Sequence, residues 1–266
     1  MPEILPVFRR SIRESWRTTL GWSVGLAAVL FLYLPLYPSF GADGQLEDII
    51  DALPKQLVDT LGYDQISTGA GYVQSTFFGL MGFLLVTIAS VAWGSAAIAG
   101  AEESGRLELD LTHGIGRAQY AVESAASVLA RLLWLGVFAG AIVWGLNEPA
   151  ELGIHPPNIV GASAALVGLA FLSASAALHA GAITGRKAWA SGAGAGVAVL
   201  GYAFQAVAKQ SPDAEWLNAF SPYAWVYHQP PLLDGVHMGG LALVWGFGFL
   251  FAAASVVFLQ RRDLRG

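Results

Sequence analysis

The segments between the apolar stretches of this chain are alternately rich and poor in basic residues. The 266-residue sequence contains six such stretches: 20–37, 72–99, 132–146, 159–183, 190–208 and 238–259. A helix needs about 20 residues to cross the hydrocarbon core of a bilayer, so each stretch can span it or nearly span it. When they are laid across a bilayer in turn, 12 of the 14 Lys and Arg residues fall on one side. The positive-inside rule then predicts six spans with both termini in the cytoplasm.

The composition fits a chain whose solvent is mostly lipid. Hydrophobic residues make up 55% of the sequence and charged residues only 12%. We therefore expect an all-α membrane protein that forms one domain over residues 1–266. The absence of cysteine excludes disulfides, thiolate metal sites and cysteine nucleophiles.

The N-terminal segment has the pattern of an amphipathic helix. Apolar residues recur every four positions and basic residues fill the other faces: Phe8, Ile12, Trp16 and Leu20 against Arg9, Arg10, Arg13 and Arg17. This pattern predicts an interfacial helix over residues 1–19 that turns into the first span, with a plain cytoplasmic anchor as the alternative. The charges interrupt any apolar core of a signal peptide, so we expect the first span to be retained.

Two outer loops are long enough to have structure of their own. Residues 39–71 carry apolar side chains at helical spacing, which predicts a short amphipathic helix, bent or restarted at Pro54, on the outer membrane face. We expect it to pack over the span ends, and a lid is the alternative. Residues 209–237 are rich in aromatic residues and proline, as is typical of an aromatic belt at the lipid headgroups.

The inner loop over residues 101–117 is the most charged inner segment after the N-terminus. Leu107 and Leu111 lie one helical turn apart, and Gly114 and Gly116 follow them. A short helix that ends in a tight turn fits this pattern. A second helix should then lead from Arg117 into the third span, where Arg131 can extend its stem to the interface and need not be a buried charge.

Small residues mark faces on which helices can approach each other closely. Gly21 and Gly25 lie four apart in the first span, and Gly192 and Gly196 lie in a glycine–alanine run of the fifth. Gly136 and Gly140 repeat the spacing in the third span. Such spacing is frequent by chance in an alanine-rich chain, so a helix interface on the first and fifth spans is left open by the residues alone.

The sequence offers little chemistry of its own. It has no Gly-x-x-x-x-Gly-Lys-Ser/Thr loop, so energy for any work must come from an ion gradient or from another polypeptide. His179 is the sole ionisable candidate for such work within the apolar stretches, and we expect a hydrogen-bonded structural imidazole, with proton handling as the alternative.

A catalytic or metal site is also not indicated. Ser163 and His179 are 16 residues apart, which is about 24 Å along a helix, so they cannot form a nucleophile and base pair. The other histidines lack metal-ligand spacing.

The second inner loop resembles a known family signature. Glu102-Glu-Ser-Gly105, Arg106-Leu-Glu-Leu109 and the later Arg117 are similar to the Glu-Glu-x-x-Gly-Thr-Leu-Glu-x-Leu-Leu motif of permease subunits of type-2 ABC (ATP-binding-cassette) exporters, of the antibiotic and multidrug efflux kind. The resemblance extends to the six spans, Leu53-Pro54, Ser221-Pro222 and the Arg261-Arg-Asp-Leu264 ending. Arg106 stands where the family usually has Thr, and Thr112-His-Gly-Ile-Gly116 replaces a usual Arg/Ser-Pro-Val-Ser run.

This resemblance implies a role for each group of residues. The loop would be a coupling helix that docks on an ATPase subunit through Glu102, Glu103, Gly105, Leu107, Glu108 and Leu109. The first and fifth spans, with Gly21, Gly25, Gly192 and Gly196, would meet a second permease half, identical or different. ATP and magnesium would be bound by the separate ATPase chains, with no cofactor in this chain.

We therefore expect a non-enzymatic permease subunit in the plasma membrane of a bacterium or archaeon, which exports a hydrophobic or amphipathic drug, antibiotic or lipid. Its path would carry hydroxyl and amide groups at Gln74, Thr76, Thr87, Ser90 and Gln205. The alternatives are a non-transporting assembly or sensory protein coupled to an ATPase, and an ion-coupled carrier. The nearly charge-free interior disfavours the carrier, because such proteins need carboxylates or histidines at mid-depth.

Overall fold

The chain is a bundle of long helices. The computed structural model describes residues 4–41, 52–54, 58 and 66–262, and no strand occurs within these ranges. Six helical stretches there are long and apolar enough to cross a membrane: Pro6–Ser39, Gly69–Glu103, Arg117–Asn147, Pro156–Thr184, Lys187–Gln210 and Met238–Arg261. The prediction of an all-α chain with six helices long and apolar enough to span a membrane is confirmed for these ranges. Most of the amphipathic helix expected in 39–71, and Asp263 and Leu264 of the C-terminal motif, lie outside the described residues.

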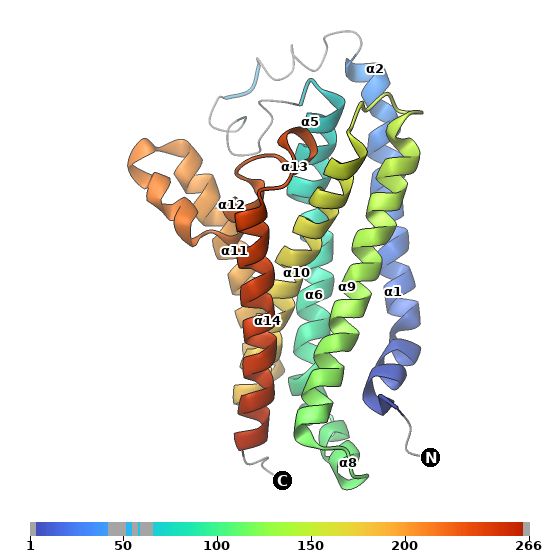
Figure 1. Cartoon of the computed structure of the whole chain (residues 1–266), viewed down its shortest axis with the longest axis vertical. Coiled ribbons are helices and arrows are strands. Elements are labelled where there is room, and N and C mark those ends of the chain that lie inside the picture. Colours follow the sequence, from blue (N-terminus) through green and yellow to red (C-terminus); the bar gives the residue numbers. More distant parts are fainter. Residues whose placement is uncertain (1–3, 42–51, 55–57, 59–65, 263–266) are drawn as a thin grey trace.

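The helices run side by side along the long axis of the molecule (Figure 1). The start of α1 (Pro6–Tyr33) and the end of α14 (Met238–Arg261) lie at the same end as the short helix α8 (Arg106–Thr112). We call this the α8 end. The opposite end carries α2 (Tyr37–Gly41), α5 (Gly69–Val73) and α13 (Pro231–Asp234), and we call it the α13 end.

The centre of the bundle is α10 (Pro156–Thr184), most of whose residues are buried. It contains no Asp, Glu, Lys or Arg and is rich in Ala, Gly and Ser, so neighbours can approach it on every side. Four helices pack against it: α6 (Gly82–Ser95), α9 (Arg117–Asn147), α11 (Lys187–Gln210) and α14. Gly94 of α6 and Gly194 of α11 lie against its backbone, where a methyl group would collide.

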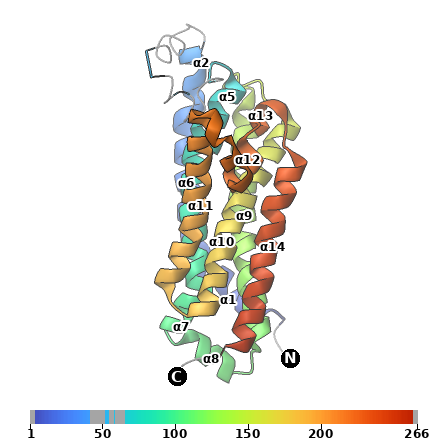
Figure 2. The ribbon, with the colours of Figure 1, turned by 90° about the vertical axis from the view of Figure 1, so that its left-hand side faces the viewer.

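The first span lies at the edge of this arrangement. Helix α1 packs mainly on α9 and also contacts α6, while α6 contacts α11 on its other side (Figure 2). Helix α1 runs without a break from Pro6 to Tyr33 and continues through the 3-10 turn η1 (Leu34–Leu36) into α2. The predicted turn between an interfacial helix at 1–19 and the span is therefore wrong. No proline interrupts residues 7–33, and Gly21 alone does not break a helix.

The second span is not a uniform α-helix. It passes from α5 through a π-helical segment, η3 (Gln74–Met81), into α6, then through a second π segment, η4 (Ala96–Gly100), into α7 (Ala101–Glu103). Such i→i+5 segments are rare and cluster at functional sites.

Short elements close the α13 end between the fifth and sixth spans. They are the 3-10 helix η5 (Pro212–Phe220), α12 (Pro222–Tyr227) and α13. Prolines stand in the first turn of each, where their fixed φ suits a helix start. The core has two parts: a large one along the spans and a smaller one at the α8 end around Leu107 and Tyr120.

Candidate coupling site at the α8 end

The loop between the second and third spans folds as two short helices and a turn. Helix α7 ends at Glu103, and Gly105 then takes a φ of 71°, which redirects the chain into α8. Gly114, with a φ of 87°, closes the turn before α9 begins at Arg117. Glycine adopts these left-handed conformations at little cost, so the glycines of this loop set its shape. The predicted short helix followed by a tight turn is confirmed.

Helix α8 has one face inside the protein and one outside. Leu107 is fully buried in the smaller core with Tyr120 and Leu178, and Asp110, one turn later, is 5% exposed. Leu109 points the other way and is 58% exposed. Of the residues predicted to dock on a partner, Leu107 thus belongs to the interior of this chain, because its i, i+3 relation to Asp110 places both on the inner face.

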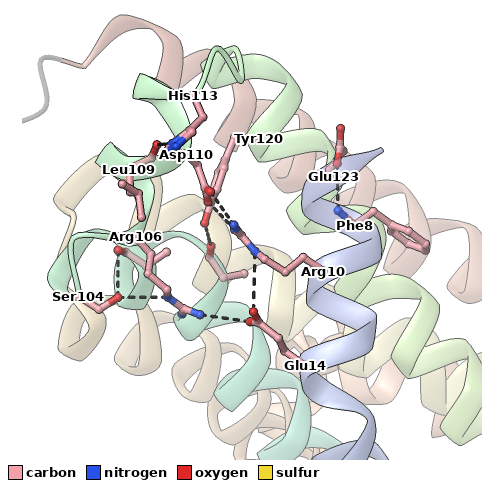
Figure 3. A network of polar contacts seen from close by, with 12 residues as sticks. Phe8, Arg10, Glu14, Ser104, Arg106, Leu109, Asp110, His113, Tyr120 and Glu123 are labelled. Carbon is pink, nitrogen blue, oxygen red and sulfur yellow. Dashed lines mark hydrogen bonds and ion pairs between the residues drawn. The ribbon is translucent and has the colours of Figure 1, made fainter. Parts of the chain in front are cut away.

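Charged side chains fasten α8 to α1. The two guanidinium nitrogens Nη1 and Nη2 of Arg10 each donate to a carboxylate oxygen of Asp110, the first at 2.6 Å. Glu14, one turn along α1, lies 3.6 Å from Arg106 and 4.0 Å from Arg10 (Figure 3). A paired arginine and carboxylate with two parallel bonds fix orientation as well as distance. The position of α8 therefore follows that of α1.

The same loop is fastened to the last two spans. Glu102 forms an ion pair with Arg262 just beyond α14, and Arg117 donates to the Arg262 carbonyl at 2.7 Å. Glu103 accepts a hydrogen bond from the backbone N–H of Lys187 at 2.7 Å, where α11 begins. A carboxylate suits a helix N-terminus, since the first N–H groups there have no partner within the helix. Glu102 and Glu103, both predicted docking residues, thus have partners within the chain.

A buried carboxylate that the sequence did not suggest holds the start of α1. Glu123 of α9 is 2% exposed and accepts from the backbone N–H of Phe8 at 2.9 Å and from Gln119 at 2.8 Å. No side chain of α1 itself caps this end. The only hint in the sequence was that Glu123 is a carboxylate in a segment whose later residues are apolar.

Arg131 is a buried cation, contrary to our expectation that its stem would carry it to the interface. It is 7% exposed, donates to the Ser127 carbonyl and the Ser15 hydroxyl at 3.0 Å each, and lies 4.8 Å from the centroid of the Trp93 ring. The packing of α1 over α9 causes this burial, because α1 covers the route that the stem would take. Arg131 lines a cavity of about 300 Å³ together with Arg10, Ser15, Trp93, Arg106 and Ser127.

The predicted substrate-path residues are not gathered in one place. Gln74 is buried and accepts from the backbone N–H of Leu232 at 3.2 Å, so it closes the α13 end. Thr76 and Ser90 donate to backbone carbonyls about one turn earlier in the same span. Gln205 is 3% exposed, and the Thr87 hydroxyl is buried without a hydrogen-bond partner in the described ranges. None of the five lines the cavity beside Arg131 or the apolar groove described next.

An apolar groove of about 630 Å³ runs between α9, α10 and α14. Gly136 and Gly140 form part of its wall, and methyl groups added there would meet Val167 and Ser163 of α10. The small residues of the third span therefore pack helices within this chain. By contrast, a methyl group at Gly21, Gly25, Gly192 or Gly196 would meet no atom within 4 Å, so these four lie on open helix faces.

His179 does not make the hydrogen bond expected of it. Its Nδ1 is buried without a hydrogen-bond partner among the described residues, and its ring packs against Phe251 and Phe258, at centroid distances of 5.7 and 5.1 Å. The expectation of a hydrogen-bonded imidazole is wrong because the sixth span presents aromatic rings at this level.

The α13 end is held by neutral groups. Asn158 donates to the carbonyls of Leu232 and Leu233, and Asn147 bonds both backbone groups of Ile154. Tyr223 donates to the Gly79 carbonyl at 2.6 Å. Burial raises the pKa of the Tyr223 phenol well above its ordinary value, so this donor stays protonated.

Comparison of the sequence with protein-family models finds no family that matches, and comparison with curated proteins finds no relative.

Proposed function

We propose that this chain is the permease subunit of an ATP-driven exporter. The observation that carries the proposal is the construction of the α7–α8 loop. Helix α8 has an exposed face built around Leu109 and is tied by an ion pair to α1, and the adjoining α7 is tied through Glu102 to the end of α14. A partner that pressed on this face would move the first and last spans together. Short rigid helices seated in a partner's groove transmit motion in this way.

The resemblance of 102–109 to the coupling helix of type-2 ABC exporters supports the same role. On this proposal the exposed members of the predicted set, Glu103, Gly105 and Leu109, meet the ATPase, with Glu108 at the edge of the face. Leu107 and Glu102 do not contact the ATPase on this proposal. They hold α7 and α8 in place within this chain. ATP and magnesium are bound by the partner, because this chain has no phosphate-binding loop.

The membrane orientation that we propose for the chain rests on the distribution of its charged residues. The α8 end carries Arg10, Arg106, Arg117 and Arg262, and the positive-inside rule assigns such an end to the cytoplasm. Both termini would then be cytoplasmic, in the plasma membrane of a bacterium or archaeon. The open glycine faces of α1 and α11 leave room for a second permease half, identical or different.

The substrate would be hydrophobic or amphipathic, passing between the two halves as ATP binding closes the cytoplasmic side. The described part of the chain supports this class because its buried charged side chains, Asp110, Glu123 and Arg131, all lie toward the α8 end. The α13 end, fixed by neutral bonds, would face outward.

Purification of the tagged chain from its own host in mild detergent tests the proposal. We expect a soluble ATPase to remain bound at about one copy per permease, and nucleotide hydrolysis in the eluate. Mass spectrometry of the eluate also shows whether a second permease is present. A pure chain without ATPase or hydrolysis would favour an assembly protein or a carrier instead.

A variant pair then tests the docking face. Leu109→Arg should abolish ATPase binding and leave the permease folded, because the side chain is exposed. Leu109→Met, which keeps an apolar side chain of similar volume, should bind as the wild type does. Equal ATPase retention by Leu109→Arg would contradict the docking role.

A further inference from the structure

The cavity beside Arg131 contains a cation that no carboxylate of the described chain neutralises. Arg131 is buried, and its partners are the Ser127 carbonyl, the Ser15 hydroxyl and the Trp93 ring, all of them neutral. The four ion pairs within the described residues involve other arginines. Taking a charge out of water is costly, and buried charges in membrane proteins accordingly mark sites of function.

The other charged side chains that line the cavity are paired. Arg10 is paired with Asp110, and Arg106 lies beside Glu14. Arg131 therefore leaves the cavity with one uncompensated positive charge. The side chains of Arg10 and Arg106 are 42% and 54% exposed, so this end of the cavity is reached from water.

The walls of the cavity suit an oxyanion. The hydroxyl groups of Ser11, Ser15, Ser124 and Ser127 line it. Those of Ser15 and Ser127 donate to the carbonyls of Ser11 and Ser124, and a hydroxyl that rotates away from its carbonyl can donate to an anionic oxygen instead. Arginine is the side chain best matched to the planar spread of oxygens in a phosphate or carboxylate. A volume of about 300 Å³ is at the lower end of the range for small-molecule sites and is sufficient for a headgroup.

Apolar side chains line the end of the cavity that is farthest from α8. They are Trp22 of α1 and Ala92 and Trp93 of α6. An apolar tail attached to a group inside the cavity could therefore contact them.

We propose that this cavity is a binding site for an oxyanion group, phosphate or carboxylate, with Arg131 as its charged ligand. An anionic lipid or amphiphile supplies such a group together with an apolar tail, and a soluble anion supplies the group alone. The site does not depend on an ATPase, so it stands or falls separately from the exporter proposal.

Lipid binding to the purified full-length chain in neutral detergent tests the site. Native mass spectrometry would compare phosphatidylglycerol with a monogalactosyl diacylglycerol of the same acyl chains, which lacks the anion. We expect the wild type to prefer phosphatidylglycerol and Arg131→Gln to lose at least about tenfold in its affinity, since hydrogen bonds to charged groups are the strong ones. Arg13→Gln removes an exposed arginine of α1 outside the cavity and should bind as the wild type does.

Thermal stabilisation by inorganic phosphate is the second arm. Stabilisation that is lost in Arg131→Gln would make the soluble anion the ligand of the same site. Arg131→Lys, which keeps the charge, and Ser15→Ala test the same site if Arg131→Gln fails to fold. We expect Arg131→Lys to retain most of the lipid preference and Ser15→Ala to reduce it severalfold.

Three results would overturn the site. One is equal phosphatidylglycerol binding by wild type and folded Arg131→Gln. Another is the absence of any preference for either anion over the uncharged lipid in the wild type. The third applies if Arg131→Gln does not fold: unchanged binding in Ser15→Ala would then refute the assignment.

Discussion

The two ends of the bundle are closed by different kinds of bond. At the α8 end, ion pairs join α8 to α1 and the loop to the end of α14. At the α13 end, no ion pair occurs among the described residues, and amide and hydroxyl groups bond to backbone carbonyls and N–H groups instead. Neutral bonds to the backbone fix one geometry. Ion pairs also fix a geometry, but salt screens them, so the two ends should respond differently to salt.

The apolar anchor beneath the ion pairs should give the largest effect on stability. Leu107→Ala removes a fully buried side chain from the smaller core and is expected to cost about 3 kcal/mol. Thermal unfolding in a nonionic detergent, followed by circular dichroism, measures the loss. Leu109→Ala, two residues away and exposed, is the matched control and should change stability by less than about 0.5 kcal/mol. Equal effects at both positions would mean that α8 has no inner face.

Asp110→Ala should give the next largest effect, because it breaks the link between α8 and α1. Asp110 is buried but Arg10 can turn to solvent, so we expect a loss of about 2 kcal/mol, below the range for fully buried pairs. A double-mutant cycle with Arg10→Ala isolates the coupling between the two side chains. A coupling energy near zero would show that this ion pair does not stabilise the α8 end.

Gln74→Leu tests the neutral bonds of the α13 end. It leaves the backbone N–H of Leu232 without its acceptor, and we expect a loss of about 1–2 kcal/mol. Unlike a change at the α8 end, this loss should be the same at low and high salt, since no charge is involved. Unfolding measured at both salt concentrations decides the point, and a strong salt dependence would contradict it.

The exposed pair of Glu14 and Arg106 should contribute least. Both side chains are more than half exposed, so Glu14→Gln is expected to cost at most about 0.5 kcal/mol at low salt. At about 1 M salt the difference should vanish, because the screening length falls to about 3 Å. A larger effect that persists in salt would show that Glu14 acts within the cavity rather than as a surface pair.

The sequence allowed the spans and the turns of the α8 loop to be predicted because those features are local. Length and hydropathy mark a span, and Gly114 marks the turn before α9 wherever the rest of the chain lies. The pairing of Arg10 with Asp110 depends on how α1 packs beside α8, across 100 residues of sequence. The burial of Arg131 has the same origin, since only the packing of α1 over α9 removes its access to water.

The roles within the predicted docking set could not be separated from sequence for a related reason. Leu107 and Leu109 have the same chemistry and lie in the same motif. Which of them faces inward depends on the helix that Gly105 starts, and hence on a backbone angle that the residue type permits but does not impose.

The two π segments of the second span bear on how this helix can accept a change of one residue in its length. A π turn holds one residue more than an α turn, so each of η3 and η4 has the form of a helix that absorbed a single insertion. Deleting one residue within either segment would convert it to an α-helix. The residues on both sides of it would keep their present orientation. The same deletion in α6 would rotate half the span by about 100° and separate Gly94 from α10. The second span is therefore the part of this fold in which the length of a transmembrane helix can change by one residue and still be tolerated.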